Sequence, residues 1–249
     1  GGAAEKQLPQ NQFDTLAMDT DVGGPSERLS ASDTSALHPS EPDLPSLTEE
    51  ELAKKTDDFI QEFFVCQDMA EAAECLSELG NVEYHPQVVY RGTLLAIEKK
   101  PKDIENLAKL LQYLTEKLHM SKYHVGRGVS LLFENLSEII MDLPKAPVLI
   151  GPIVAIALGR KIISIKQIRE ETKMLQFGGR SLLVVLAALH WMYKNSGGDV
   201  VAKEFFASED FNVMSFLPEK MQSEEAVVTL LTKYGMEDLK DLALKSTSE

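Results

Sequence analysis

The sequence predicts an all-α fold built from stacked antiparallel helical hairpins. Apolar residues recur at helical spacing from residue 46 almost to the end of the chain, and almost no segment alternates as a strand does. The breaks between helical segments are short and carry the turn-forming pairs Lys100-Pro101, Leu143-Pro144, Gly178-Gly179, Gly197-Gly198 and Leu217-Pro218. Short turns make consecutive helices antiparallel, so the hairpins are expected to stack as a HEAT-like (ARM-type) α-solenoid.

The expected helices follow from end signals and apolar spacing. The first begins at Ser46 or Thr48 as N-cap and places Leu52, Phe59, Phe63 and Phe64 on one face. Asp68 caps the second helix, Gly80 ends it, and Pro86 lies in the first turn of the third. The helical segments expected in order are 46–68, 68–80, 85–100, 103–119, 121–141, 147–161, 164–175, 179–195, 199–210, 223–235 and 236–244.

Residues 1–45 have a different composition from the helical domain, which we assign to residues 46–245. They are rich in Ser, Pro, Gly, Asp and Thr and have eight acidic and two basic side chains, a net charge of −6. Such a segment buries too little apolar surface to offset its ordering entropy. We interpret it as a disordered acidic linker, with the stretch FDTLAMD (13–19) as an alternative short docking motif.

Overall composition limits the partners that this chain can have. The chain has 249 residues, a net charge of −14 and a pI near 4.9, so we expect no direct nucleic acid binding and a basic protein or a neutral groove as partner. The longest apolar run, 146–158, is broken by Gly151 and Pro152, and the first residues show no secretory signal. We therefore expect a soluble monomer without membrane contact, cut from a longer protein.

The two cysteines, Cys66 and Cys75, have no Cys or His neighbours at metal-site spacing. We interpret them as buried, reduced thiols of a cytoplasmic protein.

Motifs that could carry catalysis or bind a cofactor or metal are incomplete. The GRGVS stretch (126–130) has the glycines of a phosphate loop without its Lys-Ser/Thr ending or a preceding strand, so we interpret it as a small-residue contact between helices. No two histidines share a helical face, which argues against a metal site. The histidines are His38, His85, His119, His124 and His190.

Aromatic residues and basic clusters also have structural interpretations. The basic clusters KKPK (99–102) and GRKIISIK (159–166) are typical of solvated helix ends. Six aromatic residues follow helical spacing in the last third of the chain and are expected in the core rather than on a base-stacking surface. They are Trp191, Tyr193, Phe205, Phe206, Phe211 and Phe216.

Glu138 and Asp142 stand where a helix would not favour them. They lie near the end of the helix that Pro144 terminates, where the helix dipole is negative and like charges four residues apart destabilise by roughly 0.2–0.5 kcal/mol. One interpretation is structural, with Asp142 capping the turn at Pro144 and Glu138 solvated. The other is that the unfavourable placement marks a functional surface.

Three stretches resemble the MA3 domain, an all-helical module of initiation factor 4 gamma and of programmed cell death protein 4. These stretches are DFIQEFFVCQDMAEAAECLSEL, YHPQVVYRGTLLAIEK and SEIIMDLPKAPVLIGPIVAIAL. The first portion of the resemblance covers residues 48 to 165, and the segments after it resemble the continuation in the animal initiation factor and its death-associated relative. Together the resemblance covers about residues 48 to 240. It favours the initiation-factor scaffold because only one copy is present.

The resemblance implies a docking domain for initiation factor 4A, a DEAD-box RNA helicase. In this family an acid, three residues and an Asp before a Pro-containing turn carry the contact, and that pattern falls on Glu138 and Asp142 with Pro144 and Lys145 in the turn. It implies a non-catalytic scaffold in cap-dependent mRNA recruitment, with no cofactor. The alternatives are an architectural domain of the death-associated relative without helicase binding, or an enzyme that uses Glu138, Asp142 or Cys66.

Overall fold

The structure is a computed structural model that describes residues 47–208 and 211–247. These residues belong to one compact unit. The interpretation of residues 1–45 as a disordered linker, and the FDTLAMD motif within them, lie outside the described residues.

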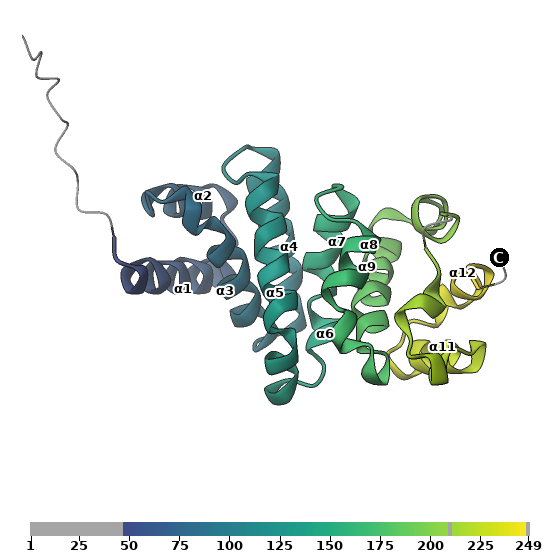
Figure 1. The fold of residues 1–249 in the computed structure, drawn as a ribbon. Coiled ribbons are helices and arrows are strands. Elements are labelled where there is room, and N and C mark those ends of the chain that lie inside the picture. Colours follow the sequence, from purple (N-terminus) through teal and green to yellow (C-terminus); the bar gives the residue numbers. More distant parts are fainter. Residues whose placement is uncertain (1–46, 209–210, 248–249) are drawn as a thin grey trace, which may run out of the picture. The chain divides into compact units, whose positions relative to one another are not determined.

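Every regular element among the described residues is helical, so the predicted all-α fold is confirmed (Figure 1). The α-helices are α1 (Glu49–Cys66), α2 (Met69–Glu78), α3 (His85–Ile97), α4 (Pro101–Glu116), α5 (Lys122–Asp142), α6 (Ala146–Leu149), α7 (Gly151–Gly159), α8 (Ile165–Glu171), α9 (Arg180–Ser196), α10 (Gly198–Val201), α11 (Glu224–Lys233) and α12 (Lys240–Lys245). Short helical turns join them: η1 (Val82–Tyr84), η2 (Lys173–Leu175), η3 (Phe177–Gly179), η4 (Ala202–Phe206), η5 (Val213–Phe216), η6 (Glu219–Met221) and η7 (Glu237–Leu239). Within this part of the chain, no helix is both long and apolar enough to cross a bilayer.

The predicted helix ends that depend on local chemistry are confirmed. Thr48 is the N-cap of α1 and forms a reciprocal capping box with Glu51. Asp68 caps α2 by accepting hydrogen bonds from two backbone N–H groups of its first turn. Gly80 ends that hairpin with a φ of +62°, which only glycine adopts without strain.

Four expected helices are interrupted. The segment 164–175 forms α8 and the turn η2, and the segment 236–244 forms the turn η7 and α12. The segment 147–161 forms α6 and α7, because Pro147 and Pro152 each occupy the first turn of a new helix. Proline has no N–H to continue a preceding helix, so it favours a fresh start at these positions. The segment 199–210 narrows to α10 and the π-type turn η4.

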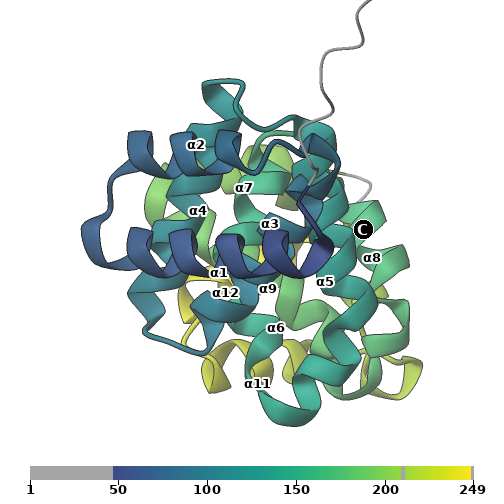
Figure 2. The same cartoon turned by 90° about the vertical axis from the view of Figure 1, so that its left-hand side faces the viewer.

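The helices stack so that each contacts its hairpin partner and the next hairpin along the chain. α3 packs against α1, α4 and α5, and α7 packs against α4 and α9 (Figures 1 and 2). One hydrophobic core runs through the described helices from Leu52 in α1 to Ala243 in α12. The helices after residue 175 therefore share the core of the earlier hairpins, as expected from the apolar run in α9.

Gly128 brings α5 and α3 into close contact, as predicted for the GRGVS stretch. A Cβ atom at this position would lie 2.5 Å from Cβ of Val89 and 2.9 Å from the carbonyl oxygen of Pro86. Only glycine allows two helix backbones to approach this closely. The glycines of this stretch therefore have a packing role in the helix interface.

The aromatic residues of the last third are core residues, as expected. Phe205, Phe206, Phe211 and Phe216 are buried, and the last three stack edge to face in sequence. Trp191 and Tyr193 are half-buried and pack against the same core.

Candidate functional site

The C-terminal end of α5 presents two carboxylates to solvent. Ser121 caps α5 by accepting a hydrogen bond from the N–H of His124, and the helix ends at Asp142 because Leu143, before Pro144, leaves the helical region. Glu138 and Asp142 are both exposed. Because they lie four residues apart in one helix, their side chains share a face.

Neither carboxylate has a partner within the described part of the chain. The structure shows no hydrogen bond or ion pair from Glu138 or Asp142 to another described residue. The turn after α5 is held by backbone bonds instead, from Leu143 N to Ile139 O at 2.8 Å and from Ala146 N to Leu143 O at 2.9 Å. The interpretation of Asp142 as the cap of this turn is therefore wrong.

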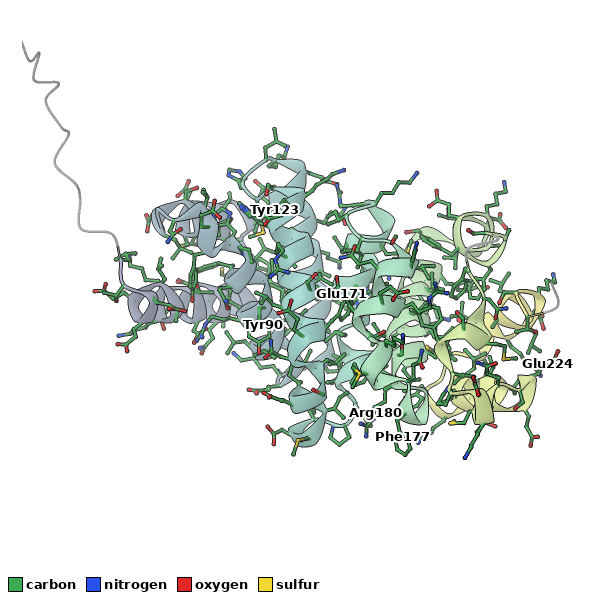
Figure 3. All side chains as sticks on the ribbon, viewed as in Figure 1. Tyr90, Tyr123, Glu171, Phe177, Arg180 and Glu224 are labelled. Carbon is green, nitrogen blue, oxygen red and sulfur yellow. The ribbon has the colours of Figure 1, made fainter. Side chains whose placement is uncertain are left out.

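Apolar and basic side chains flank the two carboxylates. Met141 lies between them in sequence with 82% of its surface exposed, and Pro144 and Lys145 are exposed in the following turn. On the neighbouring α3, burial and the charge of Glu138 raise the pKa of Tyr90 (Figure 3). We call Glu138, Met141, Asp142, Pro144 and Lys145 the acidic docking surface.

The cysteines differ from expectation. Cys66 is exposed at the last position of α1, and Cys75 is half-buried in α2, so their interpretation as buried thiols is wrong for Cys66 and only partly correct for Cys75. The helix stops at Gln67, which takes a left-handed conformation with φ +58°, and no later element covers Cys66. Burial, followed by the charges of Glu78, Glu71 and Glu62, raises the pKa of Cys75 and disfavours its thiolate.

Titratable groups that could hold a metal do not gather in the described residues. Across residues 47–208 and 211–247, the structure brings together no three His, Cys, Asp or Glu side chains at metal-binding distance. The expectation that no metal or cofactor is bound, and that this domain is no enzyme, stays a prediction.

The structure does bring together two histidines that sequence spacing kept apart. His85 opens α3 and His124 lies in the first turn of α5, and their rings meet edge to face with centroids 5.3 Å apart. His85 is only 5% exposed, and its Nδ1 atom has no hydrogen-bond partner. Burial, with a smaller contribution from His124, lowers the pKa of His85 to about 4.

The buried His85 predicts acid sensitivity of folding. Its pKa is lower in the folded state than the ordinary 6.5, so the unfolded chain binds more protons between pH 6.5 and pH 4. The stability contribution is complete above about pH 6.5 and is lost as pH falls towards 4, by about 3 kcal/mol in total. Urea unfolding followed by the fluorescence of the single Trp191 should show this decline.

The matched variants for this test are His85→Gln and His119→Gln. His85→Gln should flatten the pH dependence of unfolding between pH 6.5 and 4, whatever its effect at neutral pH. His119 is exposed and stacks on Tyr113, so His119→Gln should keep the wild-type dependence. Parallel pH profiles for wild type and His85→Gln would exclude His85 as the source.

A charge cluster between α9 and η7 was also missed by the sequence reasoning. Asp238 forms ion pairs with Lys194 and with His190, whose Nε2 lies 3.2 Å from its Oδ1 atom. Burial alone would raise the pKa of Asp238, but hydrogen bonding and charge from Lys194 and His190 lower it below its usual range. The four-residue spacing of His190 and Lys194 is the only sequence signal, and the acidic partner is far away in the chain. These contacts join η7, which precedes α12, to α9.

The stacked hairpins define the class of this protein as an all-α helical solenoid. Residues 52–164, from α1 to the N-cap of α8, match the MA3 domain.

Several translation factors are similar to this chain. Initiation factor 4G of Triticum aestivum is 27% identical over 196 residues, which cover 75% of this chain and 13% of that protein. Initiation factor 4 gamma 3 of Mus musculus is 27% identical over 179 residues, which cover 72% of this chain and 11% of that protein. The MA3 domain-containing translation regulatory factor 4 of Arabidopsis thaliana is 30% identical over 112 residues, which cover 45% of this chain and 18% of that protein.

The alignments with the initiation factors are longer than the segment that matches the MA3 domain, but they cover only a small part of each related protein. An alignment of 196 residues cannot fit within residues 52–164, so the similarity to the wheat factor extends beyond the MA3 domain. The chain spans about a tenth of the length of the initiation factors that it matches. It is similar to translation initiation factors and to translation regulatory factors.

Proposed function

We propose that this domain is a non-catalytic protein–protein interaction module of a translation scaffold that docks and modulates the DEAD-box RNA helicase initiation factor 4A. The acidic docking surface at the end of α5 makes the contact. The domain acts in the cytoplasm, where the scaffold recruits mRNA through its cap.

This proposal is supported by the exposure of Glu138 and Asp142 and by their lack of a partner among the described residues. Two carboxylates on one helix face accept charge-assisted hydrogen bonds from Arg or Lys of a partner, and Arg can bind a carboxylate with two parallel bonds. In the free domain both carboxylates stay hydrated, so they lose their water only when the partner's cations bind them.

The neighbouring residues give this surface the composition of a protein interface. Met141 offers an exposed, flexible apolar side chain at the centre, and Pro144 fixes the direction of the chain after the helix. An apolar centre with a charged rim is the usual arrangement of a specific contact. Lys145 adds a cation that can pair with an acidic residue of the helicase.

The direct test is a pull-down with purified initiation factor 4A, with and without nucleotide. We expect a complex with one helicase molecule per domain. Absence of binding in both nucleotide states would overturn the proposal and favour the architectural alternative. An ATPase and hydrolase assay on the domain alone should show no activity, and turnover would overturn the non-catalytic assignment.

A further inference from the structure

The opposite end of α5 borders a groove of about 290 Å³ with cationic walls. We call it the cationic groove. The side chains that define it come from α5, from the turn after α7 and from α8, and they are Lys122, Tyr123, Arg127, Ser130, Lys161 and Gln167. Three of these six are cations and none is an acid, in a chain whose net charge is −14. Such a local reversal of charge needs an explanation.

The helix dipole does not favour all of these cations. Lys122 is the first residue of α5, where the helix dipole is positive, and the first turn has no acid. Lys161 follows α7 in a left-handed conformation with φ +55°, a position where glycine costs less. The C-terminal end of α7, where Arg160 and Lys161 lie, is a favourable place for cations because the helix dipole is negative there. The two unfavourable features are therefore the position of Lys122 at a helix N-terminus and the left-handed backbone conformation of Lys161.

Internal ion pairs leave most of this charge available. The ammonium of Lys161 forms no ion pair with a described residue, and that of Lys122 donates only to the carbonyl oxygen of Arg160 at 3.4 Å. Arg127 has a single exposed contact with Glu134 at 3.5 Å, which contributes little.

A carboxylate behind the groove, that of Glu171, is engaged by two of the lining side chains. Glu171 does not line the groove, and its Oε1 atom accepts hydrogen bonds from Ser130 Oγ at 3.1 Å and Gln167 Nε2 at 2.8 Å (Figure 3). Its hydrogen bonds hold two of the lining side chains in place. These two neutral side chains, Ser130 and Gln167, form an ordered wall beside the cations.

Tyr123 adds an aromatic face to these cations. It is 68% exposed, and its ring meets that of His124 in an edge-to-face arrangement with centroids 5.6 Å apart. A large exposed ring beside three cations is the combination with which proteins bind single-stranded nucleic acid, by stacking bases and neutralising phosphates. An acidic peptide would use the cations but has no need of a stacking surface.

We propose that the cationic groove binds single-stranded RNA. Lys122, Arg127 and Lys161 contact phosphates, and one base stacks on Tyr123. A second groove, of about 640 Å³, shares Lys161 and Gln167 with the first and carries Lys166, but Glu204 also lines it, so the cationic track for the strand is the first groove. The acidic remainder of the surface confines the strand to this track.

This proposal revises the expectation of no direct nucleic acid binding, which followed from net charge alone. It does not depend on helicase docking, because the cationic groove and the acidic docking surface lie at opposite ends of the 21-residue α5. Charge reversal at Glu138 and Asp142 should therefore leave RNA binding unimpaired.

Fluorescence anisotropy with a labelled oligouridylate of about twelve nucleotides, at about 50 mM salt, tests the proposal. Wild type should bind saturably. Tyr123→Ala should weaken binding at least about fivefold, since stacking on an aromatic side chain contributes roughly 1–3 kcal/mol per base. Tyr123→Phe should retain binding because it keeps the ring.

A double variant, Arg127→Ala with Lys161→Ala, tests the cations of the groove. Its control is a second double variant, Lys102→Ala with Lys109→Ala. The control removes the same charge from exposed positions of α4. The groove variant should lower the slope of log K against log salt by about 1.4, since each phosphate contact on a single strand contributes about 0.7. The control should keep the wild-type slope.

Three outcomes would overturn the proposal. The first is absence of saturable binding by wild type at low salt. The second is equal weakening by the groove and control variants, which would show diffuse electrostatic attraction. The third is unchanged binding by Tyr123→Ala with full competition by polyglutamate, which would assign the groove to an acidic peptide.

Discussion

Replacing both Glu138 and Asp142 by Lys should remove most of the affinity for initiation factor 4A while leaving the fold almost unchanged. Reversing one side of a desolvated charge pair typically costs about 2–5 kcal/mol, which is a loss of roughly 30-fold to several thousand-fold in affinity. The fold should tolerate the change because both side chains are exposed and unpaired within the described residues. Cations at a helix C-terminus are in fact slightly stabilising.

The chain offers a closely matched control on another helix. Glu74 and Glu78 are also exposed and four residues apart at the C-terminal end of α2. They reproduce the spacing, the charge and the position relative to the helix dipole, but they flank neither Met141 nor the turn at Pro144. Glu74→Lys with Glu78→Lys should keep helicase binding. An unfavourable position on a helix is thus not sufficient to mark a site, and the surrounding residues decide.

Isothermal titration calorimetry with the purified helicase, together with thermal melts, separates the possible results. Lost binding with an unchanged melt in the α5 variant, and normal binding in the α2 variant, would support the acidic docking surface. Equal loss in both variants would indicate long-range charge attraction instead of a contact. Unchanged affinity in the α5 variant would remove Glu138 and Asp142 from the interface.

Local signals in the sequence predict the helix ends and the exposure of this pair. Thr48, Asp68 and Gly80 act on groups within a few residues, so their roles can be inferred without knowing the fold. Glu138 and Asp142 share a face for the same reason. The error at Cys66 is of a different kind, because its exposure depends on whether a later element covers the end of α1.

The features that escaped prediction all join residues distant in sequence. His85 meets His124, and Asp238 meets Lys194, only because hairpins stack in three dimensions. The cationic groove likewise combines the first turns of α5 with the basic cluster after α7, which sequence reasoning treated as a solvated helix end. Helical periodicity says which face is buried but not which helix lies against it.

The core also predicts a large effect for deletion of residues 176–249. Residues 181–189 of α9 are buried on every side, and α9 is so close to α7 that a Cβ atom on Gly151 would lie 2.8 Å from Cβ of Ala187. Thr172 and Ser181 add a buried hydrogen bond of 2.6 Å that joins the turn after α8 to α9. Removing α9 would leave the apolar α7 without its cover.

The truncated chain should aggregate or lose cooperative unfolding. Each large side chain of α7 returned to water costs about 1.5–3 kcal/mol, and a few such residues exceed much of the 5–15 kcal/mol that stabilises a typical domain. The loss should occur even though residues 1–175 contain the whole segment that matches the MA3 domain. Analytical ultracentrifugation, thermal melts and binding of a hydrophobic dye measure the three expected changes.

A shorter deletion, of residues 223–249, distinguishes loss of the core from loss of the C-terminal helices. It removes α11 and α12 together with Asp238, but it keeps α9 against α7. This variant should stay folded with a lower melting temperature, because it loses the ion pairs to Lys194 and His190 and the apolar contacts of Leu230 and Leu231. If the deletion from residue 176 were as soluble and stable as the full chain, α9 would belong to a separate module. The family match alone would then define the folding unit.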